Sequence, residues 1–167
     1  NDPPTLDAIS DPAAILEDAL QQTVNLSGIT AGPGESQVLT VTATSSNPGL
    51  IPTPSVSYAS PNSSGSLSYT PVANQSGTAV ITVTVTDAGG ASTSRTFTVA
   101  VGAVNDPPTL DAISDPAAIL EDAPQQTVNL SGITAGPGES QVLTVTATSS
   151  NVALIPTPAV SYTSPNS

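Results

Sequence analysis

The chain of 167 residues contains no cysteine, histidine, methionine or tryptophan, and its single basic residue is Arg95. The absence of cysteine and histidine excludes a thiolate nucleophile, a zinc site with nitrogen and sulfur ligands, and a Ser-His-Asp triad. The absence of lysine excludes Schiff-base chemistry and a P-loop. Because disulfides are impossible too, the fold must be stabilised by burial and sheet hydrogen bonds. We therefore expect a protein that is not an enzyme.

Charge is scarce and almost entirely of one sign. Charged residues are 8% of the chain, and thirteen acidic residues against one base give a net charge of -12. Such a surface repels nucleic acid and anionic lipid, but it tolerates divalent cations. Apolar residues, at 37%, can form a core, yet no apolar run is long enough to span a membrane. The opening residues do not resemble a signal peptide, and we interpret the chain as an internal part of a longer protein.

A long internal repeat organises the sequence. Residues 1–63 align without a gap onto residues 105–167, with a period of 104 residues, and only five positions differ. The pairs that differ are Leu20/Pro124, Pro48/Val152, Gly49/Ala153, Ser55/Ala159 and Ala59/Thr163. A period near 100 residues is the size of a sandwich domain rather than of a solenoid unit. The sequence predicts a complete repeat over 1–104 and the N-terminal part of a second repeat over 105–167.

Alternation of apolar and polar residues within the repeat predicts β-strands. The clearest segments are 37–44, 78–87 and 96–101, in which every second residue is apolar and many of the others are threonine. The side chains expected to face inward are Leu39, Val41, Ala43, Ala79, Ile81, Val83, Val85, Phe97, Val99 and Val101. Weaker strands are expected over 23–29, 55–60 and 66–70, an edge strand near 5–9, and a possible helical turn over 13–19. Seven short strands separated by turn residues predict an all-β, Greek-key β-sandwich.

The end of the repeat resembles a known group of domains. The segments Val83–Gly90 and Thr96–Val101, followed by Asn105-Asp106-Pro107-Pro108, are similar to the last two strands and linker of cadherin-like domains. The whole repeat resembles the bacterial Ig-like and cadherin-like tandem repeats of large secreted or surface-anchored proteins. This resemblance implies a tandem array at the bacterial cell surface or outside the cell, with neighbouring repeats or other copies as partners.

The cadherin resemblance also implies candidate calcium ligands at the junctions between repeats. Asn1, Asp2 and Asp87 would form the site at the preceding junction, and Glu17, Asn105 and Asp106 the site at the following one. Calcium prefers six to eight oxygen ligands, and an ion shared by two domains would stiffen the linker between them. The acidic pairs typical of cadherins are missing, however. Two alternatives stay open. Asp87 could be a turn carboxylate that accepts nearby backbone N–H groups, with Glu17-Asp18 as a solvated pair at a loop, and 105–108 could be a metal-free, proline-rigidified connector.

Three functions remain compatible with the sequence. The first is a structural repeat, a rigid spacer in a bacterial stalk, adhesin or fibre. The second is a carbohydrate- or protein-binding module, which would normally need more exposed aromatic side chains than three tyrosines and one phenylalanine provide. The third is a calcium-stiffened, cadherin-like adhesion repeat. Near-identical copies and a proline-rich junction favour the spacer.

The incomplete second repeat carries an expectation of its own. Residues 105–167 would supply about four of seven strands, leaving an apolar face and an unpaired sheet edge. We expect the missing strands to come from the continuing chain or from residues 64–104 of another copy by strand addition, which could build a head-to-tail assembly.

Overall fold

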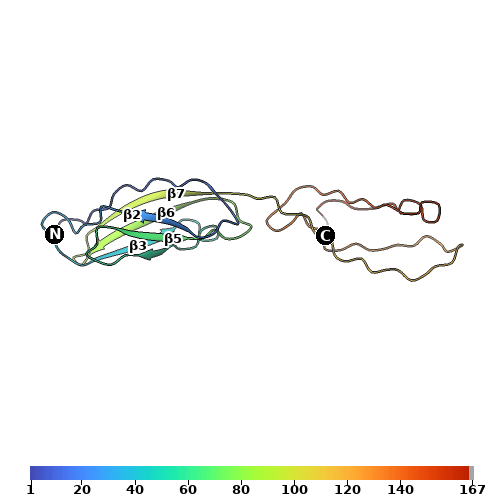
Figure 1. Ribbon diagram of the computed structural model, residues 1–167, viewed down its shortest axis with the longest axis horizontal. Coiled ribbons are helices and arrows are strands. Elements are labelled where there is room, and N and C mark those ends of the chain that lie inside the picture. Colours follow the sequence, from blue (N-terminus) through green and yellow to red (C-terminus); the bar gives the residue numbers. More distant parts are fainter. Residues whose placement is uncertain (166–167) are drawn as a thin grey trace. The chain divides into compact units, whose positions relative to one another are not determined.

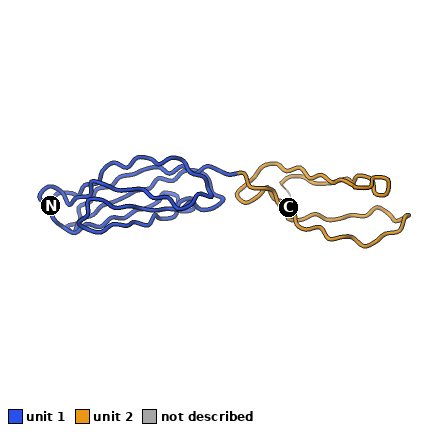
Figure 2. The backbone as a smooth tube through the Cα atoms, viewed as in Figure 1, with its two compact units in different colours: residues 1–104 blue, residues 105–167 orange. Residues whose placement is uncertain are grey.

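The computed structural model describes residues 1–165, which divide into two compact units with the boundary between Val104 and Asn105 (Figure 2). Unit 1 consists of residues 1–104 and contains seven strands (Figure 1). These are β1 (Ile15–Leu16), β2 (Gln22–Leu26), β3 (Leu39–Ser45), β4 (Ser55–Ser57), β5 (Gly65–Tyr69), β6 (Gly77–Asp87) and β7 (Ser92–Gly102). One sheet has the order β1-β7-β6-β3 and the other the order β2-β5-β4.

The two sheets enclose a core drawn from their inner faces. β6 is the best example, because Ala79, Ile81, Val83 and Val85 are all buried while the residues between them are more exposed. β3 and β7 add Leu39, Val41, Ala43, Phe97, Val99 and Val101 to the same cluster. The predicted inward face of all three strands is thus confirmed, as is the all-β sandwich with seven strands. Most of the buried side chains here are aliphatic, and Phe97 is the largest of those that are fully buried, so packing rather than polar pairing closes the domain.

The structure corrects two expectations near the N-terminus. The edge strand near 5–9 is only an isolated bridge between Thr5 and Thr30. The Thr5 N–H donates to the Thr30 carbonyl and the Asp7 N–H to the Ser27 carbonyl, but Gly28, with a φ of 66°, turns the partner segment between these two acceptors, so no ladder continues. The helical turn expected over 13–19 is instead the short strand β1, which pairs in parallel with β7 through Ile15↔Val101 and Leu16↔Gly102.

Every strand in residues 1–63 pairs with a strand in residues 64–104. β1 pairs with β7, β2 and β4 pair with β5, and β3 pairs with β6. No two of the strands β1 to β4 pair with each other in the described chain. Residues 1–63 therefore depend on residues 64–104 for every ladder that they form.

Unit 2 begins at Asn105 and has a different secondary structure. Within residues 105–165 the only β-pairing is the isolated bridge Thr109↔Thr134, the counterpart of Thr5↔Thr30. The described residues do not form the four or so strands that this half-repeat is expected to supply once its missing strands are added. The reason is physical: the strands that would pair with them belong to the part of the repeat corresponding to 64–104.

Candidate functional site

The candidate site residues of unit 1 lie at its two poles, because the chain enters the domain at one pole and leaves it at the other (Figure 1). At the entry pole Asn1 and Asp2 lie beside the turn between β6 and β7 and beside the loop that precedes β3. At the exit pole the end of β7 runs alongside β1. The site therefore consists of two sets of contacts, one where the entering chain meets the domain and one where the leaving chain meets it, and it is not a pocket.

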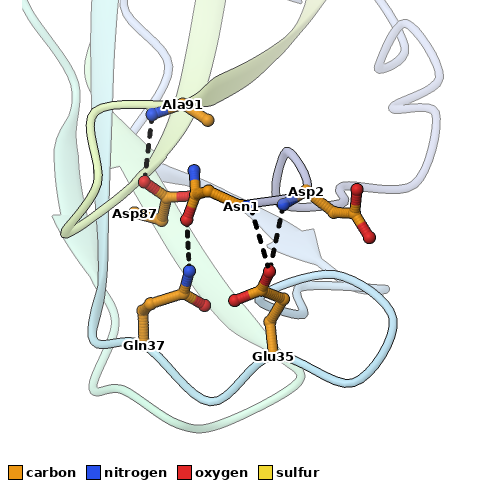
Figure 3. A network of polar contacts seen from close by, with 6 residues as sticks. All are labelled: Asn1, Asp2, Glu35, Gln37, Asp87 and Ala91. Carbon is orange, nitrogen blue, oxygen red and sulfur yellow. Dashed lines mark hydrogen bonds and ion pairs between the residues drawn. The ribbon is translucent and has the colours of Figure 1, made fainter.

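Asn1 is held at the entry pole by its side chain (Figure 3). Its Nδ2 donates to Asp87 Oδ2 over 3.0 Å, and its Oδ1 accepts a short hydrogen bond from Gln37 Nε2. Asp87 is buried, and its other oxygen accepts from the backbone N–H of Ala91 over 3.0 Å. The same carboxylate thus closes the β6–β7 turn and binds the incoming chain. Both of its oxygens accept hydrogen bonds, which stabilises the buried charge.

Asp2 is held by its backbone. Its N–H donates to Glu35 Oε1 over 3.1 Å, and the amino group of Asn1 lies 3.7 Å from the same oxygen. The contacts of Asn1 and Asp2 with Glu35, Gln37 and Asp87 are called the entry contact below.

Two glycines let the loop reach the entering chain. Gly32 and Gly34 have φ values of 109° and 71°, which only glycine adopts without strain. A Cβ at Gly32 would lie 3.2 Å from both Asp2 Cβ and the Pro3 carbonyl oxygen, so a side chain here would push the chain away. The Glu35 N–H donates to the Gly32 carbonyl, which closes a turn. This turn directs the Glu35 side chain towards Asp2.

The entry contact is partly repeated in unit 2. Asp106 N–H donates to Glu139 Oε1 over 3.1 Å, and Gln141 Nε2 donates to Asn105 Oδ1 over 3.2 Å. Gly136 and Gly138 keep positive φ values, as do their counterparts Gly32 and Gly34. Two copies of nearly the same sequence thus hold their entering residues in the same way, even though unit 2 has no strands in its described part.

Glu17 makes the exit contact. Its side chain is buried, and Oε1 accepts from the backbone N–H of Val104 over 2.7 Å. Its own N–H donates to the Gly102 carbonyl over 3.1 Å, which continues the β1–β7 pairing by one residue. The alternative interpretation of Glu17 as a solvated loop residue is therefore wrong. We call the bond between Glu17 and Val104 the exit contact.

The candidate calcium ligands are placed as follows. Asn1 and Asp87 lie together through a direct hydrogen bond, Asp2 uses its backbone towards Glu35, and Glu17 binds Val104, the residue before Asn105. Asn105 and Asp106 bind Gln141 and Glu139 within their own unit. Across residues 1–165 no three acidic, histidine or cysteine side chains gather as a metal-binding group. The carboxylates accept N–H donors here and do not form a calcium shell by themselves, so calcium stays a prediction.

The three aromatic side chains of unit 1 pack in or against its core and form no exposed binding platform. Tyr69 and Phe97 are buried, and Tyr58 packs against the core cluster. Burial raises the pKa of the Tyr69 hydroxyl above its usual value. No helix within residues 1–165 has the length and hydrophobicity needed to cross a bilayer.

Comparison with known proteins identifies the family. The family model described as "Bacterial Ig domain" matches residues 1–100. The chain belongs to the bacterial Ig domain family. This confirms the sequence-based resemblance in its Ig-like part, and the family is defined by a domain rather than by an enzymatic activity.

Solved structures of surface-layer protein SbsC share a weaker likeness. Domains 4 and 5 match with 21% identity and a TM-score of 0.39, over 60% of this chain and 53% of that one. Domains 5-6 match with 18% identity and a TM-score of 0.34, over 67% and 52%. The chain thus spans about half the length of these structures. No curated protein matches the chain.

Proposed function

We propose that this bacterial Ig domain chain is part of a tandem array that acts as a rigid structural spacer in a protein at the bacterial cell surface or outside the cell, such as a stalk, adhesin or fibre. The observation that supports this proposal best is how the linker backbone is bonded. Glu17 accepts from the N–H of Val104, and Glu139 accepts from the N–H of Asp106. Each bond lies within one unit, and the two bonded residues are only two positions apart.

Little free chain remains between the two contacts. Asn105 alone separates the bonded residues, and its side chain accepts from Gln141. Pro107 and Pro108 follow, with φ fixed by their rings. A linker with so few rotatable backbone bonds restricts the movement of the domains that it joins, whereas a Gly/Ser linker would behave as a flexible coil. The near-identity of the two copies supports the idea that the same junction recurs along the array.

Distances between spin labels test the proposal directly. Because the chain has no native cysteine, labels can be attached only where cysteine is introduced. We choose the exposed positions Thr96→Cys in unit 1 and Ser140→Cys in unit 2. We expect one narrow distance distribution in the intact chain. The double variant Glu17→Ala, Glu139→Ala should broaden it, and Glu121→Ala, which changes an exposed counterpart of Glu17, should not. An intact chain with a distribution as broad as that of a Gly/Ser linker variant would contradict the proposal.

The same labels decide the role of calcium. If hydrogen bonds alone set the junction, the width of the distribution is the same with calcium and with a chelator. A distribution that narrows only with calcium would favour the calcium-stiffened alternative. Asp106→Ala together with Glu17→Ala should then abolish the narrowing, because these residues are among the predicted ligands.

A further inference from the structure

The side-chain carboxamide of Asn1 lies in a closely fitting slot at the entry pole, beside Asp87 and Gln37 (Figure 3). The floor of the slot is Gly89 in the β6–β7 turn, where a Cβ would lie 2.9 Å from Asn1 Oδ1 and 3.0 Å from Asn1 Nδ2. The φ of Gly89 is not positive, so the backbone conformation here does not require glycine. What Gly89 provides is the space that the carboxamide occupies.

The two polar atoms of this carboxamide meet groups of opposite hydrogen-bonding character. Asp87 Oδ2 lies 3.0 Å from Asn1 Nδ2, and a carboxylate offers only acceptors. Gln37 Nε2 donates to Asn1 Oδ1, while Gln37 Oε1 is buried without a hydrogen-bond partner among the described residues. The Gln37 amide is therefore oriented by its bond to Asn1, since its reversal would bring two acceptors together. The slot fits a group with a donor on one side and an acceptor on the other, as in a primary carboxamide.

We propose that the entry pole is a carboxamide-binding site, which accepts asparagine at the first position of the linker and rejects aspartate. Aspartate has nearly the same shape as asparagine but no donor, so in the slot it would place a second carboxylate against Asp87. Asp87 is only 5% exposed, so salt and water screen this repulsion little. An aspartate side chain would either bear the repulsion or leave the slot, and the linker would lose its side-chain contact. The proposal rests on the proposed function, because it names the linker side chain that the entry pole recognises.

One half of the slot recurs in unit 2. Gln141 Nε2 donates to Asn105 Oδ1 over 3.2 Å, as Gln37 Nε2 does to Asn1 Oδ1. The same donor thus binds the same atom of the linker asparagine in both units. This donor alone does not separate asparagine from aspartate, because both have an acceptor at that position. In unit 1 the discrimination comes from Asp87.

A specificity swap in the intact chain tests the site. Urea unfolding at neutral pH, followed by circular dichroism, measures the folding equilibrium constant of unit 1, and a chelator ensures that no metal ion bridges two carboxylates. We expect Asn1→Asp to lower this constant by about tenfold or more, because a hydrogen bond to a charged group is lost and repulsion is added. Asp87→Asn should raise the constant in the Asn1→Asp chain and should not raise it in the unchanged chain. In the double variant the new amide donates to the new carboxylate and still accepts from the Ala91 N–H.

The control for this swap is Asn62→Asp, which adds the same charge at an exposed turn position. It should leave the folding equilibrium constant nearly unchanged. The proposal is overturned if Asn1→Asp is as stable as the unchanged chain, or if Asn62→Asp loses as much as Asn1→Asp does. It is also overturned if Asp87→Asn has the same effect in both chains, because the slot would then not distinguish the two side chains.

Gly89→Ala tests the slot without a change of charge. The added methyl group would displace the Asn1 carboxamide, so the variant should lose about as much stability as Asn1→Ala and little more when the two are combined. Equal losses from Gly89→Ala in the unchanged and Asn1→Ala chains would overturn the proposal, because the methyl group would then disturb the turn itself. These measurements concern the unfolding of unit 1 alone. A broad distribution of spin-label distances would therefore contradict the spacer and leave the carboxamide site standing, whereas failure of the swap would remove the site and leave the spacer.

Discussion

Residues 1–63 and residues 105–165 have almost the same sequence but very different structures. The first segment contributes four strands to a two-sheet sandwich, and the described part of the second contributes one isolated bridge. Five substitutions separate the two copies, and none lies in the segment Leu39–Ser45, which forms β3 in unit 1 and has no strand counterpart in unit 2. Local sequence alone is therefore not enough to form these strands.

In unit 1 the strands of residues 1–63 pair with strands from residues 64–104, and residues 105–165 have no such partners in the structure. Strands are stabilised by cross-strand pairs and by burial of one face, and both come from β5 to β7 in unit 1. By contrast, the part of the entry contact that Glu35 makes recurs in the second copy as Glu139, since it needs only the loop that carries this residue. The exit contact, like the sandwich, joins residues that are distant in sequence.

The largest expected effect comes from breaking the sandwich of unit 1 itself. Val83→Asp places a charge where the side chain is fully buried, which should cost on the order of 4 kcal/mol or more and unfold the unit. Val80→Asp is the matched control, with the same change on the exposed side of the same strand. Circular dichroism during thermal unfolding measures both. A Val83→Asp chain that melts like the unchanged protein would mean that the strand register is wrong.

The next effect compares the same substitution in the two copies. Leu50→Ala removes a buried side chain and should lower the free energy of unfolding by about 2–5 kcal/mol. Leu154→Ala changes its exposed counterpart in unit 2 and should have almost no effect on the free energy of unfolding of either unit. Denaturant titration of both variants provides the values. If both variants lose the same free energy of unfolding, Leu154 is buried in solution, and the two leucines do not differ as the structure indicates.

A smaller effect is expected at the exit contact. Glu17→Ala removes the acceptor for the Val104 N–H and should cost about 1.5–3 kcal/mol, the range for hydrogen bonds to charged groups. Glu17→Gln keeps an oxygen acceptor and should recover part of this loss. Glu121 is exposed, and Glu121→Ala should be close to neutral. Chemical denaturation at neutral pH checks the ranking, and the account of the exit contact fails if the two alanine variants are equally stable.

The smallest effect concerns Tyr69, whose side chain is buried in unit 1. Its pKa is raised by burial, so the folded state binds the phenolic proton more tightly than the unfolded state does. The resulting stability is fully present below the unfolded pKa of about 10 and is lost as pH rises through the folded pKa. Tyr69→Phe should therefore reduce the decline in stability above about pH 10. Unfolding measured at pH 9 and pH 11 tests this, and an identical decline in both proteins would assign the effect to other groups.

The sequence predicted the three long strands in which apolar and polar residues alternate because one face is buried and the other is exposed. In β3, β6 and β7 one side meets the core and the other meets water, so apolar and hydroxyl residues alternate. β1 has only two residues and pairs in parallel with β7, which leaves no periodic pattern to detect. The edge strand near Thr5 was predicted too long, because the partner segment turns at Gly28 between the acceptors of Thr5 and Asp7 and the pairing stops at one bridge.

The candidate site was only partly predictable. Asp87 and Glu17 were predicted from the family resemblance, and in the structure each carboxylate accepts a hydrogen bond from a backbone N–H group. Glu35 and Gln37 were missed because their role depends on a loop that folds back through Gly32 and Gly34. Their recurrence as Glu139 and Gln141 gave no help, because nearly every residue of the two copies recurs at the same spacing.

Order in the linker tests the central claim, that each unit fixes its own end of the junction. The measurement is ¹⁵N relaxation of the backbone amides of Val104, Asn105 and Asp106 in the intact chain, with the β7 amides as the internal reference. Bonds from Glu17 and Glu139 should give Val104 and Asp106 order parameters near 0.85, the value of rigid backbone. Glu17→Ala should lower the value at Val104 and leave Asp106 unchanged. Values below about 0.6 at Val104 and Asp106 in the unchanged protein would contradict the account.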